Sequence, residues 1–115
     1  MNLNDYAAKC HEANKKWWHK PDGTRIDRNR GELLMLIVSE IAEAMEGERK
    51  GLNDDKLPHR TMAEVELADA LIRIFDYAGG FGLDIHGAFE EKMAFNATRA
   101  DHTYEVRNAE GGKKW

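Results

Sequence analysis

The chain has 115 residues, 42% of them apolar and 33% charged, with a formal net charge of −4. This length suits one domain that buries a core without disulfides, and the acidic balance argues against binding a nucleic-acid polymer, which requires a basic face. No apolar run approaches the roughly 20 residues of a membrane span, and residues 1–10 lack the apolar stretch of a signal peptide. The lone Cys10 has no partner for a disulfide or a thiolate zinc site. We therefore expect a cytoplasmic protein with no membrane partner.

The first two predicted helices occupy the amino-terminal half. The first covers about residues 3–18 and stops before Pro21, whose ring cannot continue a helix. After a polar loop the second runs from about residue 32 to residue 48, with Asn29 as its candidate cap and Gly51 just behind its end.

The next two predicted helices have clearer starts. The third begins at Thr61, which has capping-box spacing with Glu64, and ends at the glycine pair 79–80. The fourth follows Asp84, a good N-cap residue, and continues to about Arg99.

These elements predict an all-α fold, because no segment alternates polar and apolar residues between turn signals. Short connections favour an antiparallel four-helix bundle-like domain over residues 1–100. Four short helices are expected to need a second subunit to cover their apolar faces, so we expect an oligomer. Residues 101–115 form a tail, which is either a lid over a ligand or a disordered end.

The second helix places a glutamate among apolar residues. On a helical wheel its apolar stripe comprises Leu33, Leu36, Ile37 and Ala44. Glu40 lies inside this stripe and Glu43 at its margin, whereas Glu46 and Glu48 fall outside and read as solvated charges. An unpaired carboxylate in an apolar contact face costs several kcal/mol or takes up a proton. The wheel therefore separates Glu40 from the ordinary acids beside it.

The third helix carries a second set of acids. One face comprises Leu67, Leu71, Ile74 and Ala78, and the opposite face comprises Glu66, Asp69, Arg73 and Asp76. Two interpretations stay open for the charged face. Glu66 and Asp69 are metal ligands, or Arg73 forms ordinary surface ion pairs with Asp69 and Asp76.

The fourth helix offers the complementary charge. Lys92, Asn96 and Arg99 stand at i, i+4 and i+7 and project along one side. Two cations and an amide in a row suit phosphate oxygens, although a solvated basic stripe is the commoner explanation of such a triplet taken alone.

Taken together, these groups indicate a particular chemistry. Four convergent carboxylates repel one another unless divalent cations lie between them, and an all-oxygen ligand set without cysteine favours Mg²⁺ or Mn²⁺ over zinc. A triphosphate bridged to the metal, with Lys92 and Arg99 balancing its charge, would be open to attack by an activated water. The set predicts hydrolysis of a phosphoanhydride.

The same residues match a known family pattern. "SEIAE" at 39–43, "ELAD" at 66–69 and "EKMAFN" at 91–96 followed by Arg99 resemble the MazG-like nucleotide pyrophosphohydrolases of the all-α NTP pyrophosphatase superfamily. The resemblance covers about residues 30–100. One position departs from the pattern: Ser39 stands where many members carry a glutamate, and a hydroxyl is a poorer ligand than a carboxylate.

The resemblance implies a role for each matched residue. Glu40 and Glu43 are the first acidic pair, which is catalytic and binds Mg²⁺, and Glu66 and Asp69 are the second metal-binding pair. The residues that meet the substrate phosphates are Lys92, Asn96 and Arg99. The implied reaction converts a nucleoside triphosphate, ribo or deoxy, to a nucleoside monophosphate and pyrophosphate in the control of nucleotide pools. Such proteins are typically homodimers or homotetramers.

Base recognition is predicted less specifically. Either Trp17 or Trp18 is a candidate to stack on the nucleobase, the alternative being simple packing in the core or an interface. Because adjacent residues point in different directions, at most one of them faces the pocket. Further polar residues have no spacing that singles one out as a reader of the base: His11, Asn14, His19 and His59.

Two alternatives to this function remain open. The same metal site could hydrolyse a diphosphate or a phosphoribosyl nucleotide, given a different base pocket. From another class, the chain could be a non-catalytic helical oligomer with a degenerate metal site that binds nucleotide or protein partners, with Ser39 as the trace of a lost ligand.

Overall fold

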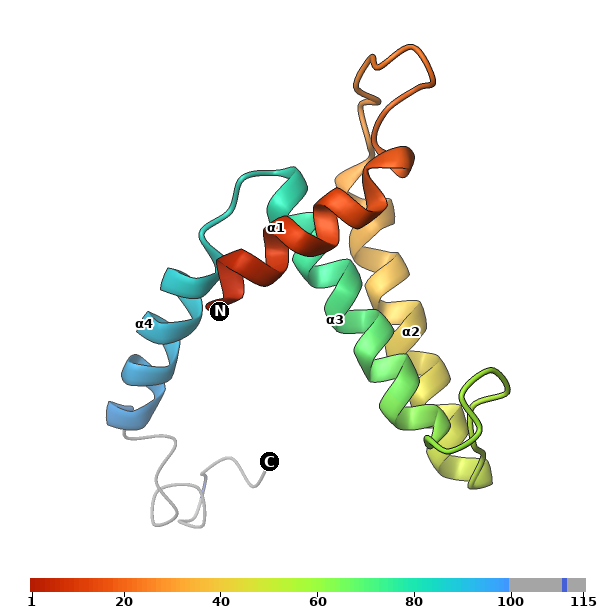
Figure 1. The fold of residues 1–115 in the computed structure, drawn as a ribbon. Coiled ribbons are helices and arrows are strands. Elements are labelled where there is room, and N and C mark those ends of the chain that lie inside the picture. The colour runs from red at the N-terminus through yellow and green to blue at the C-terminus, as the bar shows by residue number, and fades with distance from the viewer. Residues whose placement is uncertain (100–110, 112–115) are drawn as a thin grey trace. The chain divides into compact units, whose positions relative to one another are not determined.

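All regular elements in the described part of the chain are helical (Figure 1). The computed structural model describes residues 1–99 and 111. It contains α1 (Leu3–Asn14) with a following 3₁₀ turn, η1 (Lys15–Trp17), then α2 (Arg30–Lys50), α3 (Met62–Gly80) and α4 (Ile85–Thr98). The predicted all-α class and the four predicted helices are confirmed. The tail predicted at 101–115 lies outside the described residues except for Gly111.

The helix starts follow the local signals in the sequence. The Asn29 side chain accepts a hydrogen bond of 2.9 Å from the backbone amide three residues on, at the start of α2. Thr61 and Glu64 form the predicted capping box on α3, and Asp84 caps α4 through a backbone amide at 2.9 Å. Gly51 ends α2 with a φ of 63°, the left-handed conformation that favours glycine. These four positions are confirmed as predicted.

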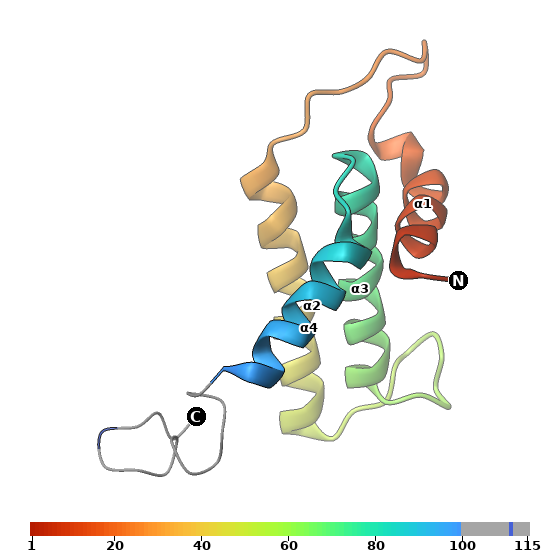
Figure 2. The same ribbon diagram turned by 90° about the vertical axis from the view of Figure 1, so that its left-hand side faces the viewer.

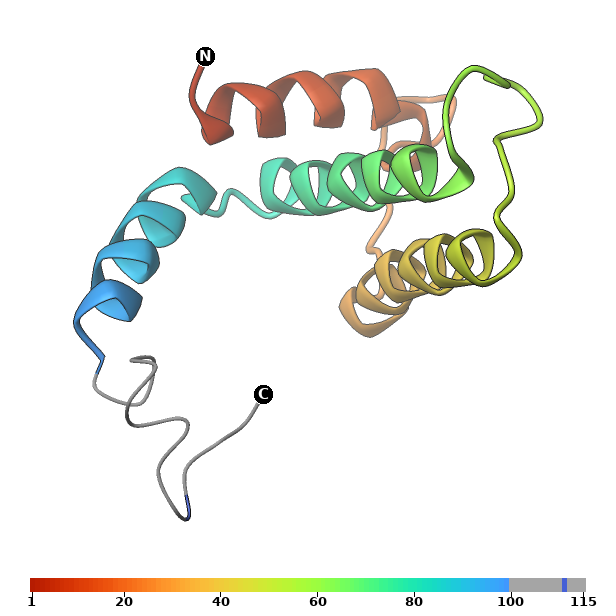
Figure 3. The same cartoon turned by 90° about the horizontal axis from the view of Figure 1, so that it is seen from below.

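Two compact units make up the chain, Met1–Leu83 and Asp84–Trp115. In the first, α3 lies between α1 and α2 and packs against both (Figures 2 and 3). α2 and α3 run antiparallel, as the short connection between them requires. In the second unit, α4 is the only helix among the described residues. No described helix combines the length and the apolar character that crossing a membrane requires.

Small residues set the spacing between the helices of the first unit. A Cβ atom added at Gly79 would lie 2.6 Å from the carbonyl oxygen of Ala7, so α1 and α3 touch through their backbones. A Cβ at Gly47 would lie 2.8 Å from Cβ of Met62, where α2 meets the start of α3. The buried apolar side chains are correspondingly small, apart from Trp18: Ala7, Ala44, Ala63, Ala70 and Ala78.

The apolar face predicted for α3 is only partly buried within the first unit. Leu67 and Leu71, placed on the apolar face, are 50% and 51% exposed, while Ala78 of the same predicted face is buried. The reason is that α3 turns its charged face toward α2, where Arg73 pairs with Glu40. The core is then left to the alanines, and the leucines lie at the surface of the described unit.

Trp18 anchors the loop that joins α1 to α2. Its ring is 1% exposed and lies against Gly80, where an added Cβ would come within 2.5 Å of the ring. His11 and Phe81 contact the ring edge-on, at 5.0 Å and 5.2 Å between centroids. This contact ties the end of η1 to the end of α3.

Candidate metal centre and adjoining cavity

Three of the four predicted acids meet between α2 and α3. Glu40 and Glu43 lie one turn apart on α2, and Glu66 reaches them from the antiparallel α3. Each contributes a carboxylate oxygen to a set in which all oxygens lie within 4.8 Å of one another. Glu40 is half-buried, as the helical wheel predicted, whereas Glu43, placed at the margin of the stripe, is exposed and Glu46, placed outside it, is half-buried. Asp69, one turn further along α3, stands outside this set of three.

The carboxylates raise one another's proton affinity. A side-chain hydrogen bond with Glu40 is the main cause that raises the pKa of Glu66 to about 7, followed by burial and by the charges of Glu43, Glu40 and Asp69. Burial and then the charge of Glu40 raise the pKa of Asp69, against the opposing effect of Arg73. The cluster therefore retains a proton near neutral pH and would be stabilised by added positive charge.

The donor set fits a hard divalent cation. Three carboxylate oxygens drawn from two helices are the ligands that Mg²⁺ and Mn²⁺ prefer, and Zn²⁺ would normally take nitrogen or sulfur. The proton held at Glu66 reduces the repulsion among the carboxylates, as a bound cation would. The residues that would hold such an ion are Glu40, Glu43 and Glu66, with Asp69 adjacent.

Arg73 is bonded to the acid cluster. Its Nε donates to Oε1 of Glu40 at 3.2 Å, with side-chain exposures of 41% and 15%. The second of the two interpretations stated for this face was that Arg73 forms ion pairs with Asp69 and Asp76. No such ion pair occurs among the described contacts. The local pattern on α3 could not reveal this contact because Glu40 lies 33 residues away.

The Ser39 hydroxyl is used inside its own helix. Its Oγ donates to the carbonyl oxygen of Leu36 at 2.6 Å, and the side chain is exposed. The position where the family pattern has a further glutamate thus contributes a hydrogen bond to the α2 backbone.

A cavity of about 460 Å³ extends from the acid cluster along α3. Glu40 and Asp69 line it at one end, and Asp76 lines it two helical turns further on. Its apolar wall comprises Leu33, Leu36 and Ile72. Two guanidinium groups, those of Arg28 and Arg73, also line it, so the cavity joins carboxylates, cations and an apolar surface.

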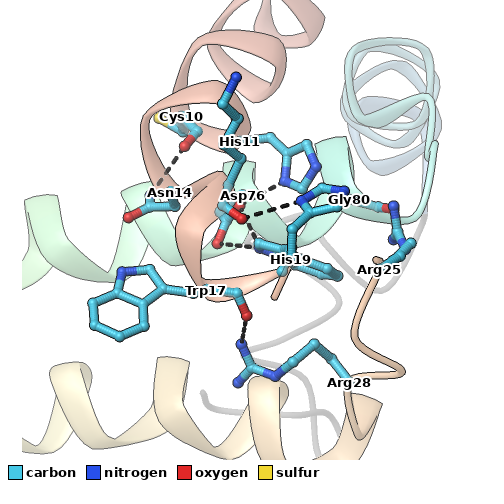
Figure 4. Close-up of polar contacts among 11 residues, drawn as sticks. Cys10, His11, Asn14, Trp17, His19, Arg25, Arg28, Asp76 and Gly80 are labelled. Atoms are coloured by element: carbon cyan, nitrogen blue, oxygen red, sulfur yellow. Dashed lines mark hydrogen bonds and ion pairs between the residues drawn. The ribbon is translucent and has the colours of Figure 1, made fainter. Parts of the chain in front are cut away.

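The Asp76 carboxylate is hydrogen-bonded to a residue of α1 and to the residue that follows η1. Its Oδ1 accepts hydrogen bonds from Nδ1 of His11 at 2.9 Å and Nε1 of Trp18 at 3.0 Å, and Oδ2 lies 3.1 Å from the same indole nitrogen (Figure 4). The side chain is 16% exposed. Sequence spacing gave no signal for this role, because the donors lie 58 and 65 residues away.

The two adjacent tryptophans have different environments. Trp17 is 59% exposed and lines the cavity, whereas Trp18 is enclosed. The carbonyl oxygen of Trp17 accepts a hydrogen bond of 3.0 Å from Arg28 (Figure 4). A stacking role for one tryptophan, as predicted, is thus sterically open to Trp17. Among the other predicted readers, Asn14 lines the cavity and His11 acts through Asp76.

The predicted phosphate-binding residues all belong to the second unit. On α4, the Lys92 ammonium and the Arg99 guanidinium lie 4.9 Å and 5.7 Å from the ring centroid of Phe95. Oδ1 of Asn96 is buried and has no hydrogen-bond partner within the described part of the chain. Their link with the acid cluster remains a prediction from the sequence.

Comparison of the chain with protein-family models, with characterised proteins and with solved structures found no match. The resemblance to MazG-like hydrolases therefore rests on the acidic motifs and on the residues after them. The functional argument that follows depends on the chemistry of the acid cluster and its cavity.

Proposed function

We propose that the protein is a Mg²⁺-dependent hydrolase that converts a nucleoside triphosphate to a nucleoside monophosphate and pyrophosphate. The observation that carries the proposal is the convergence of Glu40, Glu43 and Glu66 from two helices, in a cluster whose Glu40 also lines the cavity. Carboxylates at such spacing hold one proton among them and suit a divalent cation. The adjoining cavity offers the volume and the mixed lining that a nucleotide requires.

The side chains have distinct roles in this reaction. When bound, the cation neutralises phosphate charge and lowers the pKa of a water molecule. Glu40 and Glu43 would hold this ion, and their carboxylates would orient the attacking water toward the α-phosphorus and accept its proton. The bond from the α-phosphorus to the pyrophosphate oxygen would break as the new oxygen–phosphorus bond forms. The guanidinium of Arg73, already bonded to Glu40, lies beside the carboxylates, where phosphate charge would gather.

The nucleoside part occupies the remainder of the cavity. Its volume of about 460 Å³ falls in the range of small-molecule sites. The exposed indole of Trp17 offers a flat surface for stacking on a base, and Leu33 and Ile72 provide an apolar wall for the sugar and base.

We further propose that α4 completes an antiparallel four-helix bundle in which Lys92, Asn96 and Arg99 meet the substrate phosphates. The amide oxygen of Asn96, which is buried and unpaired among the described residues, and the Lys92 cation beside Phe95 support this role, since an unpaired amide oxygen can gain a partner when a ligand binds. Replacing Lys92 with alanine should raise KM more than it lowers kcat.

A second copy of the chain is proposed to cover the outer face of α2. Its large apolar side chains recur at helical spacing and are about half-exposed: Leu34, Val38, Ile41 and Met45. Exposed apolar stripes of this kind usually mark interfaces. Sedimentation should show a dimer or tetramer, and Val38→Glu should shift it toward the monomer. If the native chain is a monomer, the proposal is contradicted, and another part of the same chain would have to cover this apolar stripe.

The hydrolase proposal is tested with a panel of ribo- and deoxynucleoside triphosphates, with and without Mg²⁺. Monophosphate and pyrophosphate should appear in equal amounts only with the metal. Glu43→Gln should lower turnover about 100-fold or more while the helical circular dichroism stays unchanged. Glu46→Gln is the matched control, because Glu46 lies one turn away on α2 and pairs with Lys50 at 2.7 Å.

Absence of metal-dependent turnover for every nucleotide would refute the hydrolase. Saturable nucleotide binding without turnover would favour the non-catalytic alternative, for which Ser39 and its bond to the helix backbone are the supporting observation. Turnover of diphosphates alone would favour the related enzyme that uses the same metal site.

A further inference from the structure

The end of the cavity away from Glu40 and Asp69 contains two hydrogen-bond acceptors, Asn14 and Asp76, together with Arg28 and Trp17. We propose that it selects a base with an exocyclic amino group, as in cytosine and adenine, over bases with an oxo group at the same position. This inference rests on the proposed nucleotide site and names its substrate class. Its supports are Asn14 and Asp76, which both line the cavity near Trp17.

The first acceptor is the side-chain oxygen of Asn14. Its Nδ2 donates to the carbonyl oxygen of Cys10 at 3.0 Å (Figure 4). A carbonyl oxygen accepts but cannot donate, so this contact fixes which end of the amide is nitrogen. The oxygen is therefore the end of the Asn14 amide turned away from that backbone contact.

The second acceptor is the carboxylate of Asp76. A carboxylate has about four lone-pair sites, and those of Asp76 are only partly used by His11 and Trp18. Both donors are held in place, since Trp18 is buried against Gly80 and His11 projects from α1. The carboxylate thus keeps one orientation and presents its remaining acceptor capacity to the cavity that it lines.

The two arginines that line the cavity each use one N–H group in a contact within the protein. Nε of Arg73 is bonded to Glu40 at the acid cluster, and Nη1 of Arg28 is bonded to the backbone oxygen of Trp17. The remaining N–H groups of Arg73 lie beside the acid cluster and suit phosphate oxygens, whereas Asp76 lies seven residues beyond Asp69, about 10 Å along the helix axis.

An amino group and an oxo group give opposite results against such a surface. The N–H of an amino group donates to Asp76 or to Oδ1 of Asn14. An oxo oxygen would place its lone pairs against theirs, and this repulsion costs more than the absent bond alone. One hydrogen bond to a charged acceptor corresponds to a preference of about tenfold or more.

The test uses matched nucleotide pairs that differ in this one position, CTP with UTP and ATP with ITP. We expect kcat/KM to be at least about tenfold higher for the amino member of a pair, and the pair with the larger rate identifies pyrimidine or purine. Asn14→Ala should reduce the ratio, and Asp76→Asn, which introduces a donor, should reduce or invert it. Glu12→Ala, an exposed position on the same helix, should leave it unchanged.

Binding of the monophosphates CMP, UMP, AMP and IMP, measured by calorimetry, separates the two proposals. Turnover with equal kcat/KM within both pairs would overturn the base selection and keep the hydrolase. Preferential binding of CMP or AMP without any turnover would keep the base selection and overturn the hydrolase. Because Asp76→Asn can disturb Trp18, its circular dichroism is checked first, and Asn14→Ala provides the independent variant.

Discussion

Binding of a divalent cation should displace one proton from the acid cluster, so that affinity depends on pH around neutrality. The hydrogen bond with Glu40 is the main cause that raises the pKa of Glu66 to about 7. If this proton must leave before the cation binds, the association constant falls by a factor of 1 + 10^(7 − pH), which is about 11 at pH 6, about 2 at pH 7 and about 1.1 at pH 8. Affinity at pH 8 should therefore exceed affinity at pH 6 about tenfold.

Mn²⁺ serves as the probe, because its binding can be followed directly by electron paramagnetic resonance without any nucleotide. Calorimetry at pH 7 in two buffers of different ionisation enthalpy should show about half a proton released per ion bound. Glu40→Gln removes both the hydrogen-bonding acid and its charge, so the pKa of Glu66 should fall toward its ordinary value of 4.5 and the pH dependence should vanish along with part of the affinity. Glu46→Gln should bind as the native chain does.

Equal Mn²⁺ affinity of the native chain at pH 6 and pH 8 would refute this reasoning. It would mean that Glu40 and Glu66 do not share a proton, and hence that the carboxylates do not approach one another as described. Absence of Mn²⁺ binding at either pH would instead remove the metal centre itself.

Three further predictions concern stability and charge. The folded chain holds the Glu66 proton to higher pH than the unfolded chain does, so the contribution of this proton to stability is complete below about pH 4.5 and is lost as the pH rises through about 7. The urea midpoint without metal should therefore decrease from pH 5 to pH 8, and Mg²⁺ should restore it at pH 8. Gly80→Ala should destabilise the fold by about 1–3 kcal/mol in urea unfolding, since the added Cβ meets the Trp18 ring, whereas Gly31→Ala in the first turn of α2 should change stability by less than about 1 kcal/mol. Arg73→Met removes a cation that competes for Glu40, so Mn²⁺ should bind more tightly while kcat/KM for a nucleoside triphosphate falls; weaker Mn²⁺ binding would contradict the assigned role.

Local signals in the sequence predicted the helices well. Asn29, Thr61 with Glu64, and Asp84 were each recognised as caps, because capping depends on residues within one turn of the helix start. The half-buried position of Glu40 followed from its place in the apolar stripe of α2. Both inferences depend only on short spacings, which the sequence displays directly.

Contacts between distant segments could not be predicted in the same way. Spacing on α3 favoured Asp69 or Asp76 as partners of Arg73, yet its partner is Glu40 on another helix. The wheel also could not decide which tryptophan of the adjacent pair is enclosed, since that depends on the space that Gly80 leaves for Trp18. For the same reason the sequence did not show that the alanines of α3, and not its leucines, are the buried residues of this unit.

The helix α3 fixes the distance between the two ends of the cavity. Asp69 at the acid cluster and Asp76 at the far end of the cavity lie on nearly the same side of the helix, two turns apart, so the span available to a ligand is fixed at about 10 Å by the rise per residue. Inserting a single residue between them would lengthen this span by about 1.5 Å and swing Asp76 through about 100°, away from the cavity. The residue types at the two ends can change independently, but the distance between the ends can change only through an insertion or deletion in the helix.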